Sequence, residues 1–234
     1  MARPVARKRR IGPLDVIEVA GDPAAPTVIL FHGFGADMND LASLAGVIQA
    51  PKGTNFYFPN GHLSVPLGGH YEGRAWFPLR LAELESAMAA GEAIDLCNVV
   101  PPGMKKARGL ATEFIKALGV PMNRLVLGGF SQGAMIATDI TLHSEEPPAG
   151  LALLSGTLVC ENDWKELAPK KSGFKFFQAH GTFDQVLSYA YAERLEKLLL
   201  ASGWRGKLQR FSGGHEIPPE VVIQLGAYLR QVLA

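Results

Sequence analysis

Residues 124–133 read RLVLGGFSQG. The apolar run at 124–128 predicts a buried strand, and residues 132–143 directly after it have the apolar spacing of a helix. Between them, Gly129-Phe130-Ser131-Gln132-Gly133 fits the pattern G-x-S-x-G, in which a serine occupies a sharp strand-to-helix turn. This pattern predicts a turn that exposes the Ser131 hydroxyl. The alternative, a glycine-rich phosphate-binding turn, is disfavoured because a GxGxxG pattern is missing.

The rest of the chain repeats the alternation of strands and helices. Short apolar runs predict strands at 14–19 (a half-exposed edge strand), 27–31, 54–58, 150–155, 174–179 and 207–211. Helical spacing predicts helices at 103–118, 188–201 and 219–233. This order predicts an α/β fold with a mostly parallel sheet and helices on both faces. We interpret residues 1–234 as a single domain.

Residues 60–100 interrupt this alternation. They begin rich in glycine and polar residues, and 79–90 then has the pattern of a short amphipathic helix. A long, partly irregular insertion is more often functional than filler, so we expect a lid or pocket wall here. Its apolar side chains suit the inner side of a flap; the alternative is that they are satellite core residues under a long loop. They are Leu63, Val65, Leu67, Tyr71, Trp76, Phe77 and Leu79.

A nucleophilic serine needs a base and an acid, which follow it in the order acid, then histidine in folds with this turn. Asp184 comes after the predicted strand 174–179, and His215 comes after 207–211. We expect His215 to take the Ser131 proton and Asp184 to orient the imidazole. Considered singly, His215 could be an ordinary loop histidine, and Asp184 could be the N-cap of the next helix.

Such a site also needs two backbone donors for an oxyanion. One is expected from the N–H of Gln132, at the start of the helix that follows the serine. The other is expected from the N–H of Phe34, in the glycine-rich loop 32–35 that follows the strand 27–31. The alternative for this loop is a plain glycine turn.

Charge and composition exclude several other classes. With 23 Lys and Arg against 22 Asp and Glu, the net charge of +1 gives no reason to expect a nucleic-acid partner. Cys97 and Cys160 are too few for a disulfide framework and lie near no histidine–acid pair in sequence, so a cysteine nucleophile is not expected. The six histidines are scattered, without HExxH or CxxC patterns, and we expect neither a metal nor a cofactor.

The one local charge imbalance is in residues 1–12, where five basic residues have no acidic neighbour before residue 15. We interpret this segment as a solvated, frayed terminus; the alternative is contact with a membrane surface. No apolar stretch follows it as in a secretory signal, and no run approaches the ~18 apolar residues of a spanning helix. We therefore expect a soluble, cytoplasmic protein without stable membrane insertion.

Six segments together resemble the phospholipase/carboxylesterase family, which includes acyl-protein thioesterases: HGFGAD at 32–37, FPNG at 58–61, GRAWF at 73–77, GGFSQGA at 128–134, HGTFD at 180–184 and GGHEI at 213–217. The resemblance implies an α/β-hydrolase fold without a large cap domain. It implies hydrolysis of short- to medium-chain acyl esters, lysophospholipids or S-acyl groups through an acyl-enzyme intermediate. A homodimer is compatible with it.

By position, the resemblance supports Ser131, Asp184 and His215 as the triad, and Phe34 and Gln132 as the oxyanion donors. It also implies that Trp76 forms a wall of the acyl pocket, with Phe77 and Leu67 as further substrate contacts.

Two local departures from the family pattern bear on substrate choice. Pro78 stands where an acid usually follows the Trp-aromatic pair, and Gln185 follows the proposed acid. Two alternative functions stay open. One is a dienelactone-hydrolase-like enzyme, which would use a cysteine nucleophile; the other is a non-catalytic binding module on the same fold.

Overall fold

The computed structural model describes residues 6–68, 72–79, 86 and 95–233. The strands are β1 (Ala6–Ile11), β2 (Leu14–Val19), β3 (Thr27–Phe31), β4 (Asn55–Pro59), β5 (Leu63–Pro66), β6 (Glu72–Ala75), β7 (Leu125–Phe130), β8 (Gly150–Leu154), β9 (Lys175–Gly181) and β10 (Arg205–Phe211). The α-helices are α2 (Met104–Leu118), α3 (Gln132–His143), α4 (Glu161–Leu167), α5 (Tyr189–Ala201) and α6 (Pro219–Val232). Short 3₁₀ helices occupy Ala42–Gly46, Met122–Arg124 and Ala168–Lys171.

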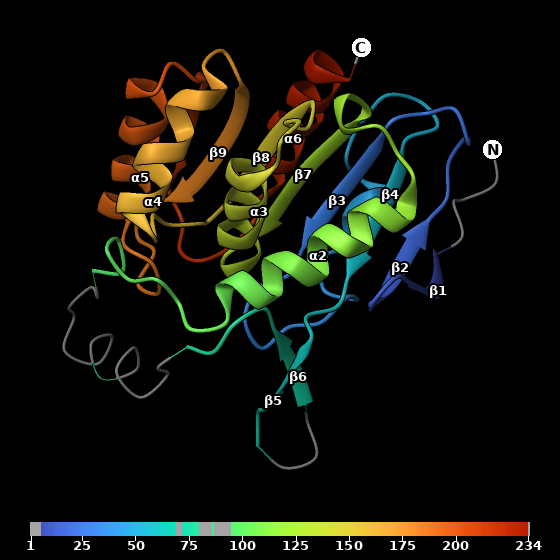
Figure 1. Cartoon of the computed structure of the whole chain (residues 1–234), viewed down its shortest axis with the longest axis horizontal. Helices are drawn as coiled ribbons and strands as arrows, with labels where there is room; N and C mark the ends of the chain where they lie inside the picture. The colour runs from blue at the N-terminus through green and yellow to red at the C-terminus, as the bar shows by residue number, and fades with distance from the viewer. Residues whose placement is uncertain (1–5, 69–71, 80–85, 87–94, 234) are drawn as a thin grey trace.

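Eight of these strands form one twisted sheet in the order β1-β2-β4-β3-β7-β8-β9-β10 (Figure 1). The β1–β2 and β2–β4 pairs are antiparallel, and all pairs from β4 to β10 are parallel. The carboxyl ends of the parallel strands therefore meet at one edge of the sheet, where loops carry functional groups in such folds. This arrangement confirms the predicted α/β fold.

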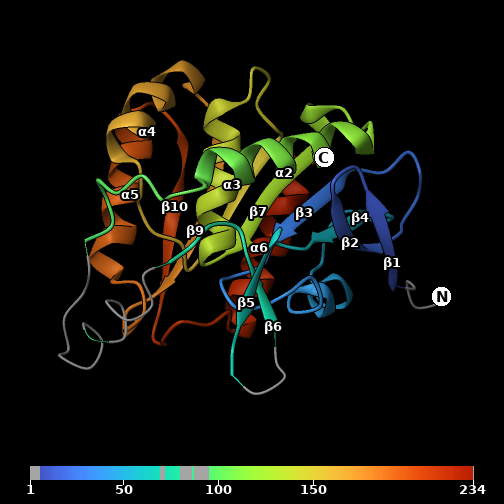
Figure 2. The same ribbon diagram turned by 60° about the horizontal axis from the view of Figure 1, so that its bottom comes forward.

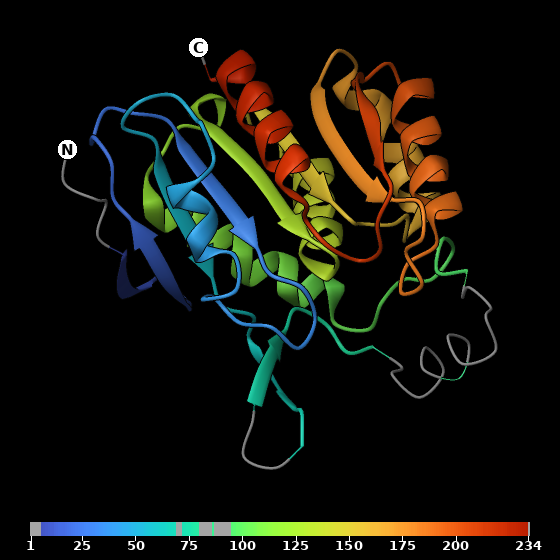
Figure 3. The ribbon, with the colours of Figure 1, turned by 180° about the vertical axis from the view of Figure 1, so that it is seen from behind.

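Helices cover both faces of the sheet. Helices α2 and α3 lie on the face seen in Figure 1, with α4 and α5 toward the β10 end, and α6 lies on the opposite face, seen in Figure 3. Side chains alternate between the two layers along each strand: Ile29 and Phe31 of β3 pack under α2 and α3, whereas Val28 and Leu30 pack against α6. All five residues of β3 are buried, as expected for a central parallel strand.

Residues 6–11 of the basic N-terminal segment form a strand, so the prediction of a frayed terminus is wrong for these residues. They form β1, which pairs with β2 along its whole length. The charges are partly neutralised because Arg9 contacts both carboxylate oxygens of Glu18, at 3.0 and 2.9 Å, and Arg10 contacts Asp15 at 3.3 Å. The segment 14–19, predicted as an edge strand, is consequently the second strand of the sheet.

The insertion at 60–100 contributes a two-stranded antiparallel hairpin, β5 and β6. This hairpin projects beyond the carboxyl ends of the central strands (Figure 2). The helix predicted at 79–90 falls, apart from residues 79 and 86, outside the described residues. Within the part of the chain that is described, no helix combines the length and apolarity needed to cross a bilayer.

Candidate active site

Ser131 lies at the turn between β7 and α3, where the sequence predicts it. Its backbone has φ 55° and ψ −119°, a conformation that L-residues rarely adopt. The turn is held by a 2.8 Å hydrogen bond from the Ser131 N–H to the carbonyl of Leu154, at the end of β8. A strained residue fixed in this way at the carboxyl edge of the sheet fits a nucleophile elbow.

The flanking glycines are required by close backbone approach. A Cβ on Gly133 would lie 1.9 Å from the carbonyl oxygen of Phe31, and one on Gly129 would lie 2.4 Å from the carbonyl carbon of Gly133. Both distances are far below any real Cβ contact, so only glycine allows β3, β7 and α3 to pack this tightly. The packing also brings the loop after β3 against Ser131.

Asp184 and His215, which lie 31 residues apart in sequence, meet directly. The Nδ1 atom of His215 is 2.7 Å from Oδ2 of Asp184. The imidazole of His215 also packs on the ring of Phe130, with centroids 4.7 Å apart, so it lies beside the residue that precedes Ser131. The structure thus brings the three predicted triad residues to one region at the ends of β7, β9 and β10.

The Asp184 carboxylate is buried and surrounded by donors. Its Oδ1 accepts hydrogen bonds from the N–H groups of Val186 (2.9 Å) and Leu187 (2.8 Å), and its Oδ2 faces both His215 and His180. Burial alone would raise the pKa of Asp184, but the hydrogen bonds from His180, His215 and Leu187 together hold that pKa well below its usual range. The group is therefore a carboxylate at neutral pH.

The loop after β3 is positioned by His32. Its Nε2 accepts a 2.9 Å hydrogen bond from the N–H of Gly61, so Nδ1 carries the proton that is donated to the carbonyl of Gly33 at 2.7 Å. Burial lowers the pKa of His32 to about 4, which keeps the ring neutral in this arrangement. A Cβ on Gly33 would stand 3.3 Å from Cβ of Ser131, so Phe34 follows immediately after a residue that touches the elbow.

The two predicted oxyanion donors are backbone N–H groups of Phe34 and Gln132. Among the described residues, neither N–H donates a hydrogen bond to another protein group. That of Gln132 belongs to the first turn of α3, where the helix dipole favours negative charge. Both groups lie in segments that touch Ser131, as an oxyanion site requires.

The side chain of Gln132 has a separate structural role that the sequence did not reveal. It is completely buried; its Oε1 accepts the N–H of Trp76 at 2.9 Å, and its Nε2 donates to the carbonyl of Phe77 at 2.7 Å. The residue after Ser131 therefore fixes the backbone of the segment that follows β6.

Trp76 and Phe77, predicted as substrate contacts, both have 0% exposed surface. The Trp76 indole donates to the carbonyl of His32 at 3.0 Å and packs edge-on against Phe31. In this conformation both side chains belong to the core, and their contact with substrate stays a prediction. Leu67, the third predicted contact, is 52% exposed at the end of β5, within 3.4 Å of the Cβ position of Gly35.

Two further residues near the triad were not identified from sequence. Phe183 immediately precedes Asp184 and is 69% exposed, an unusual environment for a phenyl ring. Ser155, at the end of β8, has φ 47°, and its hydroxyl donates to the carbonyl of Glu216 at 3.2 Å, which holds the loop that carries His215. Only the position of Phe183, inside the HGTFD segment, offered a sequence signal.

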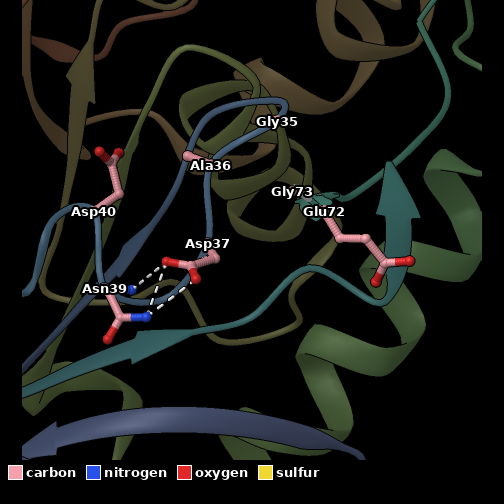
Figure 4. A pocket seen from close by; sticks show the side chains of 7 residues that line it. All are labelled: Gly35, Ala36, Asp37, Asn39, Asp40, Glu72 and Gly73. Carbon is pink, nitrogen blue, oxygen red and sulfur yellow. Dashed lines mark hydrogen bonds between the residues drawn. The ribbon is translucent and has the colours of Figure 1, made fainter. Parts of the chain in front are cut away.

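A hollow of about 370 Å³ opens beside the loop after β3 (Figure 4). It is lined by Gly35, Ala36, Asp37, Asn39, Asp40, Glu72 and Gly73, and it contains no triad residue. Asp37 accepts hydrogen bonds from the backbone and side chain of Asn39. Partial desolvation and then the charge of Asp37 raise the pKa of Asp40. The lining of the hollow is therefore acidic.

One group of side chains has the composition of a metal site. Ligand atoms of Asp139, His143 and Asp163 all lie within 4.8 Å of one another. However, Arg108 contacts Oδ2 of Asp139 at 2.7 Å, and the indole of Trp164 donates to Oδ1 at 3.1 Å. Because a guanidinium already neutralises the buried carboxylate, we interpret this group as an internal ion-pair network.

Cys97 and Cys160 are both buried free thiols. Burial raises the pKa of each thiol to about 12, so neither forms a thiolate at neutral pH. The reactive form of cysteine is the thiolate, and neither residue lies at the elbow. These features disfavour the dienelactone-hydrolase-like alternative, which requires a cysteine nucleophile.

The mostly parallel sheet and the strand–serine–helix elbow at its carboxyl edge define an α/β-hydrolase fold. Residues 13–233 match the model of the phospholipase/carboxylesterase family, and the chain belongs to that family. The prediction of a hydrolase is thereby confirmed.

Relatives and solved structures agree with this assignment. The chain is 26% identical to acyl-protein thioesterase 1 of Candida albicans, over 93% of this chain and 96% of that protein. It is 28% identical to acyl-protein thioesterase 1 of Mycosarcoma maydis, over 89% and 92% of the two chains. The crystal structure of esterase PE8 is similar with a TM-score of 0.74 and 26% identity, over 92% of this chain and 97% of that chain.

A carboxylesterase from Mesorhizobium loti shares the fold, with a TM-score of 0.72 and 18% identity over 96% of this chain and 98% of that one. The family match, together with the two similar thioesterases and esterase PE8, supports an esterase- or thioesterase-type hydrolase.

Proposed function

We propose that the chain cleaves carboxylic esters or thioesters through an acyl-enzyme formed on Ser131. The 2.7 Å hydrogen bond between His215 and Asp184, beside the elbow that carries Ser131, is the observation that carries this proposal. In the proposed mechanism, His215 takes the hydroxyl proton as Ser131 attacks the acyl carbon. The imidazolium then gives that proton to the leaving alcohol or thiol, and a water molecule later hydrolyses the acyl-enzyme with the same base.

Asp184 supports both steps without changing its own protonation. It orients the imidazole through Nδ1 and stabilises the imidazolium by its charge. The N–H groups of Phe34 and Gln132 would bind the oxyanion of each tetrahedral intermediate, a contribution of about 2.7–4 kcal/mol per donor in comparable sites.

The substrate class that best fits the relatives is an S-acyl group or a short- to medium-chain ester, with lysophospholipids as a further class. The two similar fungal proteins are acyl-protein thioesterases, and the similar PE8 structure is an esterase. Trp76, Phe77 and Leu67 remain our candidates for acyl contacts, and the exposed ring of Phe183 joins them because it lies beside Asp184.

A substrate panel tests the proposal. It consists of p-nitrophenyl esters of increasing acyl length, one acyl thioester and one lysophospholipid, each assayed with wild type, Ser131→Ala and Ser144→Ala. Ser144 lies at the far end of α3 and serves as the matched control. We expect activity on at least one ester or thioester that Ser131→Ala loses and Ser144→Ala keeps. Activity that survives in Ser131→Ala would refute the proposal.

A further inference from the structure

His180, the penultimate residue of β9, contacts the proposed triad without having a role in the chemistry described above. Its side chain is fully buried. Its Nε2 lies 3.1 Å from Oδ2 of Asp184, the same oxygen that contacts His215. The same Nε2 lies 2.8 Å from the carbonyl oxygen of Leu187. Two histidines therefore share one carboxylate oxygen.

The geometry fixes where the His180 proton lies. A carbonyl oxygen can only accept a hydrogen bond, so the Nε2 atom facing Leu187 must carry hydrogen. The other ring nitrogen, Nδ1, is buried and has no hydrogen-bond partner among the described residues. A proton on Nδ1 would be a buried donor without an acceptor, which is unfavourable. His180 is therefore held as a ring with hydrogen on Nε2 alone, and this single N–H faces both the carbonyl oxygen of Leu187 and Oδ2 of Asp184.

We infer that His180 is a positioning residue that shares Oδ2 of Asp184 with His215 and so limits how strongly Asp184 stabilises the His215 imidazolium. This inference rests on the triad proposed above. Among the described residues, the polar contacts of the His180 side chain are with Asp184 and Leu187 and not with Ser131, so we assign His180 to the control of the base and not to the reaction itself.

The physical reason is competition for one oxygen. Oδ1 of Asp184 is already used by the N–H groups of Val186 and Leu187, so both histidines depend on Oδ2. The N–H of His180, shared between Oδ2 and the carbonyl of Leu187, draws negative charge of the carboxylate toward itself and away from His215. Without it, more of that charge faces His215, and the imidazolium becomes more stable. The enzyme would then need a higher pH to hold His215 in its neutral, proton-accepting form.

Two other titratable side chains lie near the histidines, and neither contacts the Asp184 carboxylate in place of His180. Tyr189 of α5 packs edge-on against His180, with ring centroids 6.2 Å apart. Glu216, next to His215, accepts a hydrogen bond from the N–H of Gly214. Across the described part of the chain, neither side chain forms a hydrogen bond or ion pair with Asp184.

The test is the pH profile of kcat/KM on p-nitrophenyl butyrate, with product quantified by chromatography at each pH. His180→Met removes the donor, and His180→Gln keeps an amide N–H at the same distance along the side chain. Gln178→Met is the matched control, because Gln178 lies on the same strand, is fully buried and donates to the carbonyl of Ala192 without touching Asp184.

For His180→Met we expect the midpoint of the profile to move to higher pH by roughly half a unit or more. His180→Gln and Gln178→Met should keep the wild-type midpoint, whatever they lose in stability. A His180→Met midpoint equal to wild type would overturn the inference. An equal shift in all three variants would do the same, because it would reflect general loosening of the fold.

A measurement on the wild-type protein keeps the inference testable if the variants do not fold. In ¹⁵N-labelled histidine spectra, His180 should show the tautomer with hydrogen on Nε2 throughout the pH range in which kcat/KM rises. The opposite tautomer would overturn the inference. If His215→Ala remains active, the proposed triad is wrong. If His215 is essential and only the pH shift in His180→Met is missing, the triad stands and only the role inferred for His180 is wrong.

Discussion

The replacement Gln132→Met tests whether the side chain of Gln132, the residue after Ser131, holds the backbone of the segment after β6 in place. Methionine has a similar volume to glutamine and no hydrogen-bonding amide, so the core stays filled while two hydrogen bonds are lost. The N–H of Trp76 and the carbonyl of Phe77 would then be left without partners in a site where Gln132 is 0% exposed. The backbone N–H of Gln132, the proposed oxyanion donor, is unchanged.

The expected size of the effect follows from these two groups. A buried backbone group left unpaired costs about 1–3 kcal/mol, so Gln132→Met should lower the free energy of unfolding by about 2–5 kcal/mol. Gln178→Met removes a single hydrogen bond, from Nε2 to Ala192, because the Oε1 of Gln178 has no partner among the described atoms. Its expected cost is about 1–3 kcal/mol. The two variants are matched in chemistry and in burial.

Urea unfolding followed by circular dichroism gives both free energies, provided that the slope with urea is the same in all three proteins. The structure predicts that Gln132→Met loses more stability than Gln178→Met by at least about 1 kcal/mol. Equal losses, or a larger loss in Gln178→Met, would show that Gln132 does not hold the segment as its contacts indicate.

Three other perturbations have expected outcomes. Trp76→Ala should lower the free energy of unfolding by about 3–5 kcal/mol, because the indole is fully buried. Phe183→Ala should change it by less than about 0.5 kcal/mol, because the ring is 69% exposed, and similar losses in urea unfolding would contradict this prediction. The depressed pKa of Asp184 contributes stability that is complete above about pH 5 and is lost progressively as the pH falls below that value. The urea midpoint of wild type should therefore fall more between pH 6 and pH 3 than that of Asp184→Asn, and parallel falls would refute the assignment. Iodoacetamide at pH 8 should leave Cys97 and Cys160 unmodified in the native protein and alkylate both in urea, because burial raises the pKa of each thiol to about 12. Rapid labelling of the native protein with loss of activity would instead favour a cysteine nucleophile.

The features that could be predicted from sequence are those governed by local pattern. The continuous apolar run of β3 and the strand–turn–helix pattern around Ser131 each depend on a few neighbouring residues, and both are in the structure where the sequence places them. The meeting of Asp184 with His215 could be anticipated because both follow strands of a parallel sheet, whose carboxyl ends share an edge.

The features that were missed depend on partners distant in sequence. The run of positive charge before residue 11 has no local sign of pairing, and it becomes a strand because Glu18 and Asp15 lie across the hairpin. The apolar character of Trp76 could not distinguish a pocket wall from the core, since both need a large aromatic ring. The role of His180 depends on a carboxylate oxygen that also contacts His215, and no sequence spacing records that sharing.

The central claim is that Ser131 becomes acylated, and mass spectrometry can observe this directly. The protein is mixed with a p-nitrophenyl ester, quenched in acid within the first turnover and digested for peptide mapping. We predict an added acyl group on the peptide that contains Ser131, and none in Ser131→Ala, whose kcat should fall on the order of 10⁴-fold or more. An acyl group on a different residue, or rapid turnover by Ser131→Ala, would contradict the account.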